Sequence, residues 1–173
     1  DPEFSTVESP NPEDPNAFAE AIKLGREVGA DILLATDPDA DRLGVAVKNK
    51  AGEYETLTGN ELGALLLDFI LSQTDSRLLS NARMIKTIVT SELGRAIASS
   101  YGVKTLDTLT GFKYIGEKIN EFDSTGETFV FGYEESYGYL MTTCVRDKDG
   151  VHATIKTCEM AAYWKSRGLT LLD

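Results

Sequence analysis

Residues 32–42 constrain the fold of this chain most, because a short apolar run leads directly into three aspartates at alternate positions. An apolar run of this length, bounded by turn residues, is typical of a buried β-strand. In extended backbone the residues i, i+2 and i+4 point the same way, so Asp37, Asp39 and Asp41 can converge on one point. Three carboxylates held so close repel one another unless a cation lies between them.

A hard divalent cation accounts best for this loop. Mg²⁺ takes oxygen ligands and keeps coordination positions for water or phosphate, so we interpret the three aspartates as magnesium ligands. An EF-hand beginning at Asp37 is excluded, because the positions that require Gly and Glu hold Arg42 and Lys48. Two alternatives stay open. One is a phosphatase with an aspartate nucleophile, although Asp41 occupies the place of the usual Thr or Val, and the other is a solvated acidic turn.

The charge of the chain limits its partners. A formal net charge of −11 argues against nucleic acid and against anionic membranes, and it is compatible with a bound divalent cation. No apolar run approaches 18 residues and the acidic, Pro-rich start does not resemble a signal peptide, so we expect a cytoplasmic protein. His152 is the only histidine, which removes His-rich metal sites and most Ser-His or Cys-His nucleophiles.

Predicted strands and helices alternate along the chain, which indicates an α/β fold with mixed, largely parallel sheets covered by helices. The first part has a helix from residue 16 that ends at Gly29, followed by strands at 32–35 and 43–47 and a short strand that ends at 57. A helix from residue 60 comes next, then a strand at 84–89, a helix at 92–100 and a strand at 101–106. A strand at 128–131 and a helix at 151–165 complete the chain. We expect Asn60 to cap its helix and the last helix to bury Ile155, Cys158 and Ala162.

Two further loops follow predicted strand ends, where ligand sites in such sheets lie. The first, residues 108–114, combines a glycine, an aromatic ring and a lysine, which suit a sugar phosphate. The second, residues 132–138, places adjacent carboxylates and a hydroxyl between two glycines, and carboxylates accept hydrogen bonds from sugar hydroxyls. Either loop alone is equally consistent with a polar turn.

Taken together, five segments in this order resemble the α-D-phosphohexomutase family, which includes phosphoglucomutases and phosphomannomutases. They are DPDADRLGVAV, LTGNELGALL, TGFKYIGEKI, GYEESYGY and RDKDG. The resemblance runs from the SPNPE segment to the last helix. It implies phosphoglucomutase-like domains, with the second half of the second domain at residues 1–57 and the third domain at residues 58–173.

The resemblance also implies a role for each loop. Mg²⁺ would be bound by Asp37, Asp39 and Asp41, with Arg42 as the neighbouring cation. The substrate-binding residues would be Arg42, Thr110, Gly111, Phe112, Lys113, Glu134, Ser136 and Lys148. Of these, Glu134 and Ser136 would contact sugar hydroxyls, and Lys148 resembles a ligand-facing lysine of the glucose-specific branch. Tyr133 stands where many family members have glycine, which leaves the shape of its loop open.

Two family motifs do not occur in this sequence: the Ser-His-Asn-Pro context of the catalytic serine and the phosphate-binding Arg-x-Ser-Gly-Thr. We therefore expect a fragment that is inactive by itself and that depends on missing domains of the same polypeptide. The intact enzyme would interconvert hexose 1-phosphate and hexose 6-phosphate, preferably of glucose, through a phosphoserine and a hexose bisphosphate. A module that binds Mg²⁺ or sugar phosphate without turnover is a further hypothesis.

Overall fold

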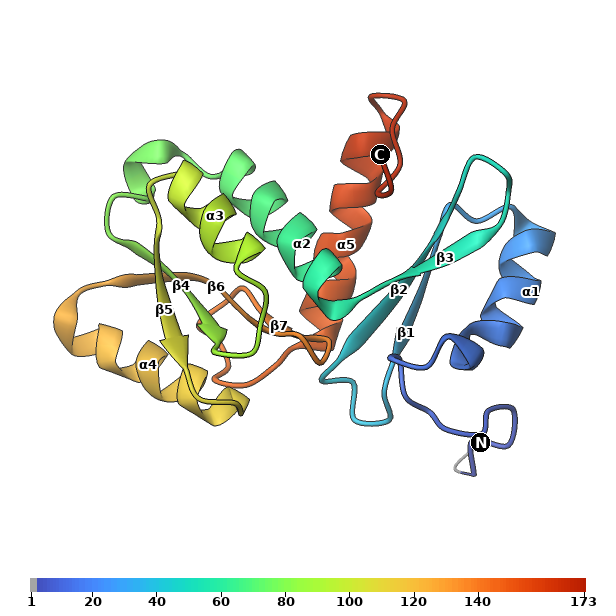
Figure 1. Ribbon diagram of the computed structural model, residues 1–173, viewed down its shortest axis with the longest axis horizontal. Coiled ribbons are helices and arrows are strands. Elements are labelled where there is room, and N and C mark those ends of the chain that lie inside the picture. Colours follow the sequence, from blue (N-terminus) through green and yellow to red (C-terminus); the bar gives the residue numbers. More distant parts are fainter. Residues whose placement is uncertain (1–2) are drawn as a thin grey trace.

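The computed structural model describes residues 3–173 and contains two β-sheets, one on each side of the last helix (Figure 1). The first sheet has the order β1-β2-β3, and both of its strand pairs are antiparallel. Its elements are η1 (Pro15–Phe18), α1 (Ala19–Val28), β1 (Ile32–Thr36), β2 (Leu43–Lys48) and β3 (Tyr54–Leu57). The connections between these strands are too short for crossover helices, so the strands pair antiparallel. As predicted, α1 ends at Gly29, whose φ is +72°.

The second sheet has the order β5-β4-β6-β7, in which only β7 is antiparallel to its neighbour. Its elements are α2 (Gly59–Gln73), η2 (Ser76–Leu78), β4 (Ala82–Thr87), α3 (Leu93–Ser100), β5 (Lys104–Thr108), α4 (Phe112–Thr125), β6 (Thr128–Glu134) and β7 (Gly138–Leu140). Helices α2 and α3 cover one face of this sheet and α4 covers the other (Figure 1). The predicted mixed α/β class is confirmed, and parallel pairing is confined to this sheet.

Helix α5 (Gly150–Lys165) lies between the two sheets and packs against β1 and β2 on one side and β7 and α2 on the other (Figure 1). Its buried residues are Gly150, Ala153, Thr157 and Met160. The prediction that this helix buries Ile155, Cys158 and Ala162 was wrong, because all three residues are exposed. The observed buried stripe and the predicted stripe both have helical spacing. The residues of the observed stripe are mostly small, which allows the two sheets to approach the helix closely.

Two local predictions also need correction. Thr58, and not Asn60, caps α2: the Thr58 hydroxyl accepts a hydrogen bond from the Glu61 amide at 3.3 Å, and the Glu61 carboxylate accepts one from the Thr58 amide at 2.7 Å. Strand β5 begins at Lys104 rather than at residue 101, because Gly102, with φ at +73°, first turns the chain out of α3. Within residues 3–173, none of the helices combines the length and apolar character needed to span a membrane.

Candidate functional site

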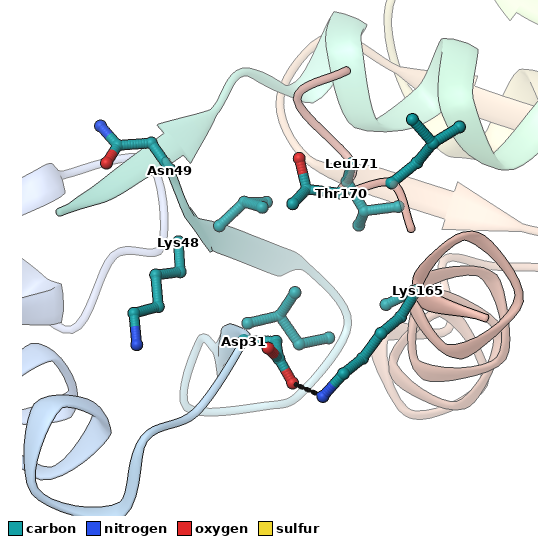
Figure 2. Close-up of a pocket in the computed structure, with 10 residues that line it drawn as sticks. Asp31, Lys48, Asn49, Lys165, Thr170 and Leu171 are labelled. Carbon is teal, nitrogen blue, oxygen red and sulfur yellow. Dashed lines mark hydrogen bonds and ion pairs between the residues drawn. The ribbon is translucent and has the colours of Figure 1, made fainter. Parts of the chain in front are cut away.

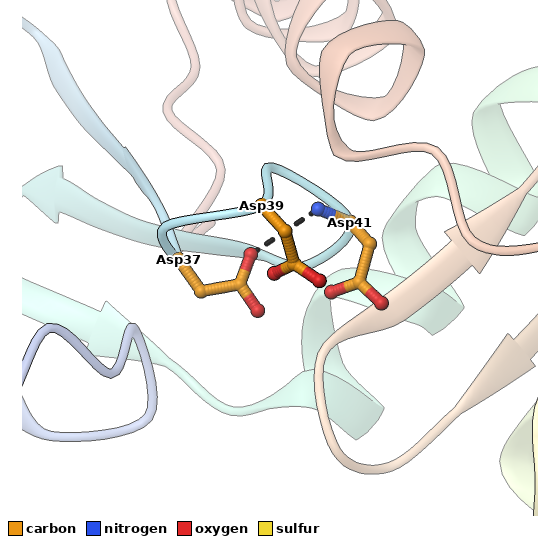
Figure 3. Close-up of side chains that lie close together, drawn as sticks. All are labelled: Asp37, Asp39 and Asp41. Carbon is orange, nitrogen blue, oxygen red and sulfur yellow. Dashed lines mark hydrogen bonds between the residues drawn. The ribbon is translucent and has the colours of Figure 1, made fainter.

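The three aspartates lie on the loop that joins β1 to β2, and their side chains extend to the same side of it (Figure 3). Each offers a carboxylate oxygen, and these three oxygens lie within 4.8 Å of one another. Asp37 is only 6% exposed, whereas Asp39 is exposed. Ala40, with φ at +57°, provides the sharp turn between the second and third aspartates. The convergence expected from alternate spacing is therefore present in the structure.

Arg42 fixes the first aspartate. Its Nε donates to Asp37 Oδ2 at 2.7 Å, and the backbone amides of Asp41 and Arg42 donate to Asp37 Oδ1 at 3.2 and 3.1 Å. Burial alone would raise the pKa of Asp37, but the hydrogen bonds from Arg42 outweigh it and hold the pKa below its ordinary value. The guanidinium is itself held by Glu13, whose Oε1 accepts from Nη1 at 2.9 Å. Asp37 is thus ionised and rigidly oriented.

The donor set of this loop fits Mg²⁺. All the candidate ligand atoms are carboxylate oxygens, which hard cations prefer, and three ligands leave coordination positions for water or phosphate. The pKa of Asp41 is raised by burial and by the neighbouring charge of Asp37, although Lys148 opposes the shift. A cation between the aspartates would relieve this repulsion. The identity of the ligands remains a prediction.

Lys148 connects the aspartate loop to the second sheet. Its Nζ lies 3.1 Å from Asp41 Oδ2, 3.9 Å from Glu134 Oε1 and 6.0 Å from the centre of the Phe112 ring. The backbone joins the same regions, since the Gly150 amide donates to the Ala40 carbonyl at 3.1 Å. Predicted residues from distant segments of the chain therefore meet at one place.

Glu134 ends β6 and is 5% exposed. Burial raises the pKa of Glu134, and the positive charge of Lys148 opposes that shift. Ser136 is half-buried in the turn that follows. Tyr133, in contrast, is fully buried and packs against Gly63 of α2 and Gly94 of α3, so its ring does not shape the surface of the turn.

The other predicted loop lies at the start of α4. Gly111 has φ at +121°, a conformation that only glycine adopts readily, and it allows β5 to turn into the helix. Phe112 is buried, while Thr110 and Lys113 are exposed. The Nζ of Lys113 lies 4.9 Å from the centre of the Tyr114 ring. The structure thus brings Phe112 to Lys148 and leaves Thr110 and Lys113 on the open side of the loop.

Comparison with known families identifies two adjacent domains. Residues 58–172 match the phosphoglucomutase/phosphomannomutase alpha/beta/alpha domain III, and residues 1–52 match the alpha/beta/alpha domain II. The chain belongs to the phosphoglucomutase/phosphomannomutase family. Phosphoglucomutase of Staphylococcus aureus (strain N315) is 43% identical over 173 residues, which make up 100% of this chain and 31% of that protein. The family member described here thus spans about a third of the length of the curated relatives it matches.

Solved structures of the family share the fold. A structure named as a putative phosphomannomutase from Thermus thermophilus aligns with a TM-score of 0.77 and 24% identity over 99% of this chain and 35% of its own. A phosphoglucomutase/phosphomannomutase family protein from Burkholderia thailandensis aligns with a TM-score of 0.69 and 21% identity, over 89% and 31% of the two chains. The family models therefore confirm the predicted family, and these structures confirm its mixed α/β architecture.

Sequence reasoning missed three contributors to this candidate site. Glu13 lies in the N-terminal segment, and the separation of 29 residues from Arg42 gives no local signal of their ion pair. Gly150 has no room for a side chain, because a Cβ there would lie 2.6 Å from the Ala40 carbonyl oxygen. A Cβ on Gly138 would likewise collide with the Lys148 side chain, which packs directly against this glycine. Only the family resemblance could have pointed to these three residues, because each of them lies in a sequence segment on which the resemblance rests.

A separate hollow of about 290 Å³ lies between α5, the first sheet and residues 169–171 (Figure 2). Lys165 donates to Asp31 Oδ2 at 2.6 Å across its mouth. Asp31 precedes β1 whereas the aspartate loop follows it, so this hollow lies at the opposite end of the strand from the candidate metal site. No predicted site residue lines it.

Proposed function

We propose that the polypeptide carrying this chain is a Mg²⁺-dependent phosphohexomutase that interconverts hexose 1-phosphate and hexose 6-phosphate, with glucose phosphates as its favoured substrates. The observation that carries this proposal is the meeting of the aspartate loop, Lys148 and Glu134 between the two domains. This place combines groups that suit a metal ion, a phosphate and sugar hydroxyls. The name of the Staphylococcus aureus relative supports glucose as the sugar.

Asp37, Asp39 and Asp41 would hold the Mg²⁺. When bound, the ion neutralises negative charge on a transferring phosphoryl group. Arg42 offsets part of the charge of the aspartates and keeps Asp37 in place. The phosphoryl donor, a serine expected from the family, would come from a part of the polypeptide outside this chain.

The second domain would hold the sugar. Glu134 and Ser136 accept hydrogen bonds from hydroxyls, and the loop at Thr110, Gly111, Phe112 and Lys113 offers an exposed cation and hydroxyl. A mutase binds its substrate in two orientations, so that each phosphate of the bisphosphate intermediate in turn faces the serine. Contacts to hydroxyls, rather than to one phosphate alone, allow both orientations to be held.

An aspartate-nucleophile phosphatase is less compatible with the sequence of the loop and with the family. In such an enzyme the first aspartate attacks phosphorus and the fifth position of the motif is Thr or Val. Asp41 occupies that position here, and most of the chain matches a phosphoglucomutase/phosphomannomutase domain. We therefore assign no nucleophile to this chain.

The test is an assay of the parent polypeptide for conversion of glucose 1-phosphate to glucose 6-phosphate with Mg²⁺, with the 173-residue chain assayed beside it. We expect an active parent and an inert chain, because the serine and the substrate-reading residues lie on different parts of the protein. Release of phosphate by the chain alone would support the phosphatase. A parent inert toward both glucose and mannose phosphates, yet binding Mg²⁺ in calorimetry, would favour a non-catalytic module.

A further inference from the structure

A buried lysine lies beneath the loops of the second sheet. Lys86 is 0% exposed and belongs to β4, which has neighbours on both sides. A buried ammonium is costly unless it is paired. Its Nζ lies 2.8 Å from Glu92 Oε1 and 3.2 Å from Asp107 Oδ1. It also donates to the carbonyls of Thr87 and Thr90, at 3.2 and 3.0 Å. Lys86 therefore fixes the loop after β4 against β5.

Two buried threonines extend this network toward β6. The hydroxyls of Thr87 and Thr90 lie 2.6 Å apart, and Thr90 Oγ1 lies 2.9 Å from Glu135 Oε2. Thr87 Oγ1 also lies 3.2 Å from Glu135 Oε2, but each hydroxyl has one proton, and the two shortest distances are satisfied when Thr87 donates to Thr90 and Thr90 donates to Glu135. The Glu135 amide in turn donates to Thr90 Oγ1 at 3.3 Å. Glu135 is thus held by both its side chain and its backbone.

Glu135 stands between the two residues proposed to bind the sugar. Glu134 faces Lys148, whereas Glu135 reaches away from it, toward the threonines. The backbone of the turn also presses on α2, since a Cβ on Gly59 would collide with the Glu135 carbonyl. Tyr137, with φ at +65°, closes the turn in a conformation that needs support from its surroundings.

We propose that Glu135 is a positioning residue: its hydrogen bonds with Thr90 fix the turn that presents Glu134 and Ser136 to the hexose. This inference rests on the proposed function. Its carboxylate does not contact the substrate, and it acts through the backbone of the turn. Loss of the anchor leaves Glu134 and Ser136 chemically intact but free to move, so it weakens sugar binding rather than removing a sugar contact.

The experiment uses the parent mutase with four single variants, Glu135→Ala, Glu135→Gln, Thr90→Val and Thr90→Ser, and one double variant. Loss of a charge-assisted hydrogen bond predicts that Glu135→Ala and Thr90→Val each raise KM for glucose 1-phosphate about tenfold. Glu135→Gln keeps an acceptor oxygen and Thr90→Ser keeps the hydroxyl, so both should stay within about threefold of the wild type. The Glu135→Ala/Thr90→Val double variant should be no worse than the poorer single variant.

Three results would overturn the inference. A purely structural role would reduce the folded fraction and apparent kcat but leave KM unchanged, so normal KM in Glu135→Ala would contradict positioning. Additive effects in the double variant would show that the two side chains act separately. If Glu135→Ala does not fold, the matched pair Thr90→Val and Thr90→Ser decides by the same criterion. An inert wild-type parent would overturn the proposed function as well, whereas an active parent with an unaffected Glu135→Ala overturns this inference alone.

Discussion

The loop after β1 and the turn after β6 both place acidic side chains beyond a strand end, but they arrange these side chains differently. In the loop, three carboxylates from alternate positions converge within 4.8 Å. In the turn, two carboxylates from adjacent positions diverge: Glu134 faces Lys148 and Glu135 faces Thr90. The acidic residues of the two regions have similar chemistry, so their spacing and the backbone shape of each segment make the difference.

Backbone shape decides: the turn at Ala40 brings the three aspartates to one side, whereas Glu134, the last residue of β6, and Glu135 point to opposite sides, as successive residues of a strand do. Carboxylates on the same side accumulate repulsion that a cation must relieve, whereas carboxylates on opposite sides each find a partner of their own. The loop is therefore a candidate metal site, and the turn is a candidate sugar contact with an anchor behind it. Substitutions that change charge or spacing in either region test this contrast.

The largest expected effect comes from Asp39→Asn. Asp37 has Arg42 as a partner and Asp41 has Lys148, whereas Asp39 is the exposed member of the convergent set. Removing its charge should lower kcat/KM of the parent on the order of 10³-fold at a fixed Mg²⁺ concentration. Near-normal turnover would contradict the metal assignment. Asp31→Asn is the matched control, because that exposed carboxylate lies outside the loop and should leave activity unchanged.

Gly150→Ala should separate the aspartate loop from α5. The new Cβ would meet the carbonyl oxygens of Ala40 and Arg42 at 2.6 and 2.8 Å, and backbone atoms cannot move aside easily. We expect a loss of about 1–3 kcal/mol in the free energy of unfolding of the 173-residue chain, measured in urea, together with weaker Mg²⁺ binding.

Gly29→Ala provides the comparison for this substitution. Gly29 has φ at +72° and open space around it, so alanine there costs about 1–2 kcal/mol through backbone conformation alone. It lies away from the loop and should leave Mg²⁺ affinity unchanged. Equal Mg²⁺ affinity in the two variants would show that contact with α5 does not shape the aspartate loop.

Lys148→Met should change the two regions in opposite directions. Its ammonium lies 3.1 Å from Asp41 and 3.9 Å from Glu134, so its removal increases the negative charge of the loop. We expect roughly fivefold tighter Mg²⁺ binding to the chain in calorimetric titration. We also expect a lower kcat/KM in the parent, because Lys148 is one of the proposed substrate-binding residues. Weaker Mg²⁺ binding would mean that Lys148 supports the aspartates instead of competing for them. Lys165→Met, which removes an exposed ion pair, is the control.

Local patterns predicted much of the first region. The apolar run, the three alternate aspartates and Gly29 each act within a few residues, and the structure has the strand, the convergence and the helix end where expected. The antiparallel pairing of β1 with β2 depends on a short connection that the alternation of strands and helices did not reveal.

Long-range packing determined what the sequence could not predict. Helix α5 carries two stripes of helical spacing, and only the presence of a sheet on each side decides which of them is buried. The anchors Glu13 and Thr90 lie 29 and 45 residues from the groups they hold, so no short window of sequence contains both partners. Adjacent Glu134 and Glu135 are chemically alike, and their separate roles follow only from what each one faces.

The smallest expected effect is a difference in acid stability between the two regions. The folded-state pKa of Asp37 lies below the ordinary 3.8, so ionisation of Asp37 stabilises the fold above pH 3.8. This contribution to stability is lost as the pH falls through the folded-state pKa. The folded-state pKa of Glu134 lies above the ordinary 4.5, so ionisation of Glu134 destabilises the fold. This destabilisation disappears as the pH falls from the folded-state pKa toward 4.5. Urea unfolding of the chain from pH 3 to pH 7 separates the two.

Asp37→Asn should reduce the loss of stability below about pH 4. Glu134→Gln should remove the gain of stability that appears as pH falls toward 4.5. The two variants therefore flatten different parts of the same profile. The same change in both would mean that burial, rather than the partner each carboxylate faces, sets its pKa. In that case the contrast between the convergent loop and the divergent turn would not extend to their electrostatics.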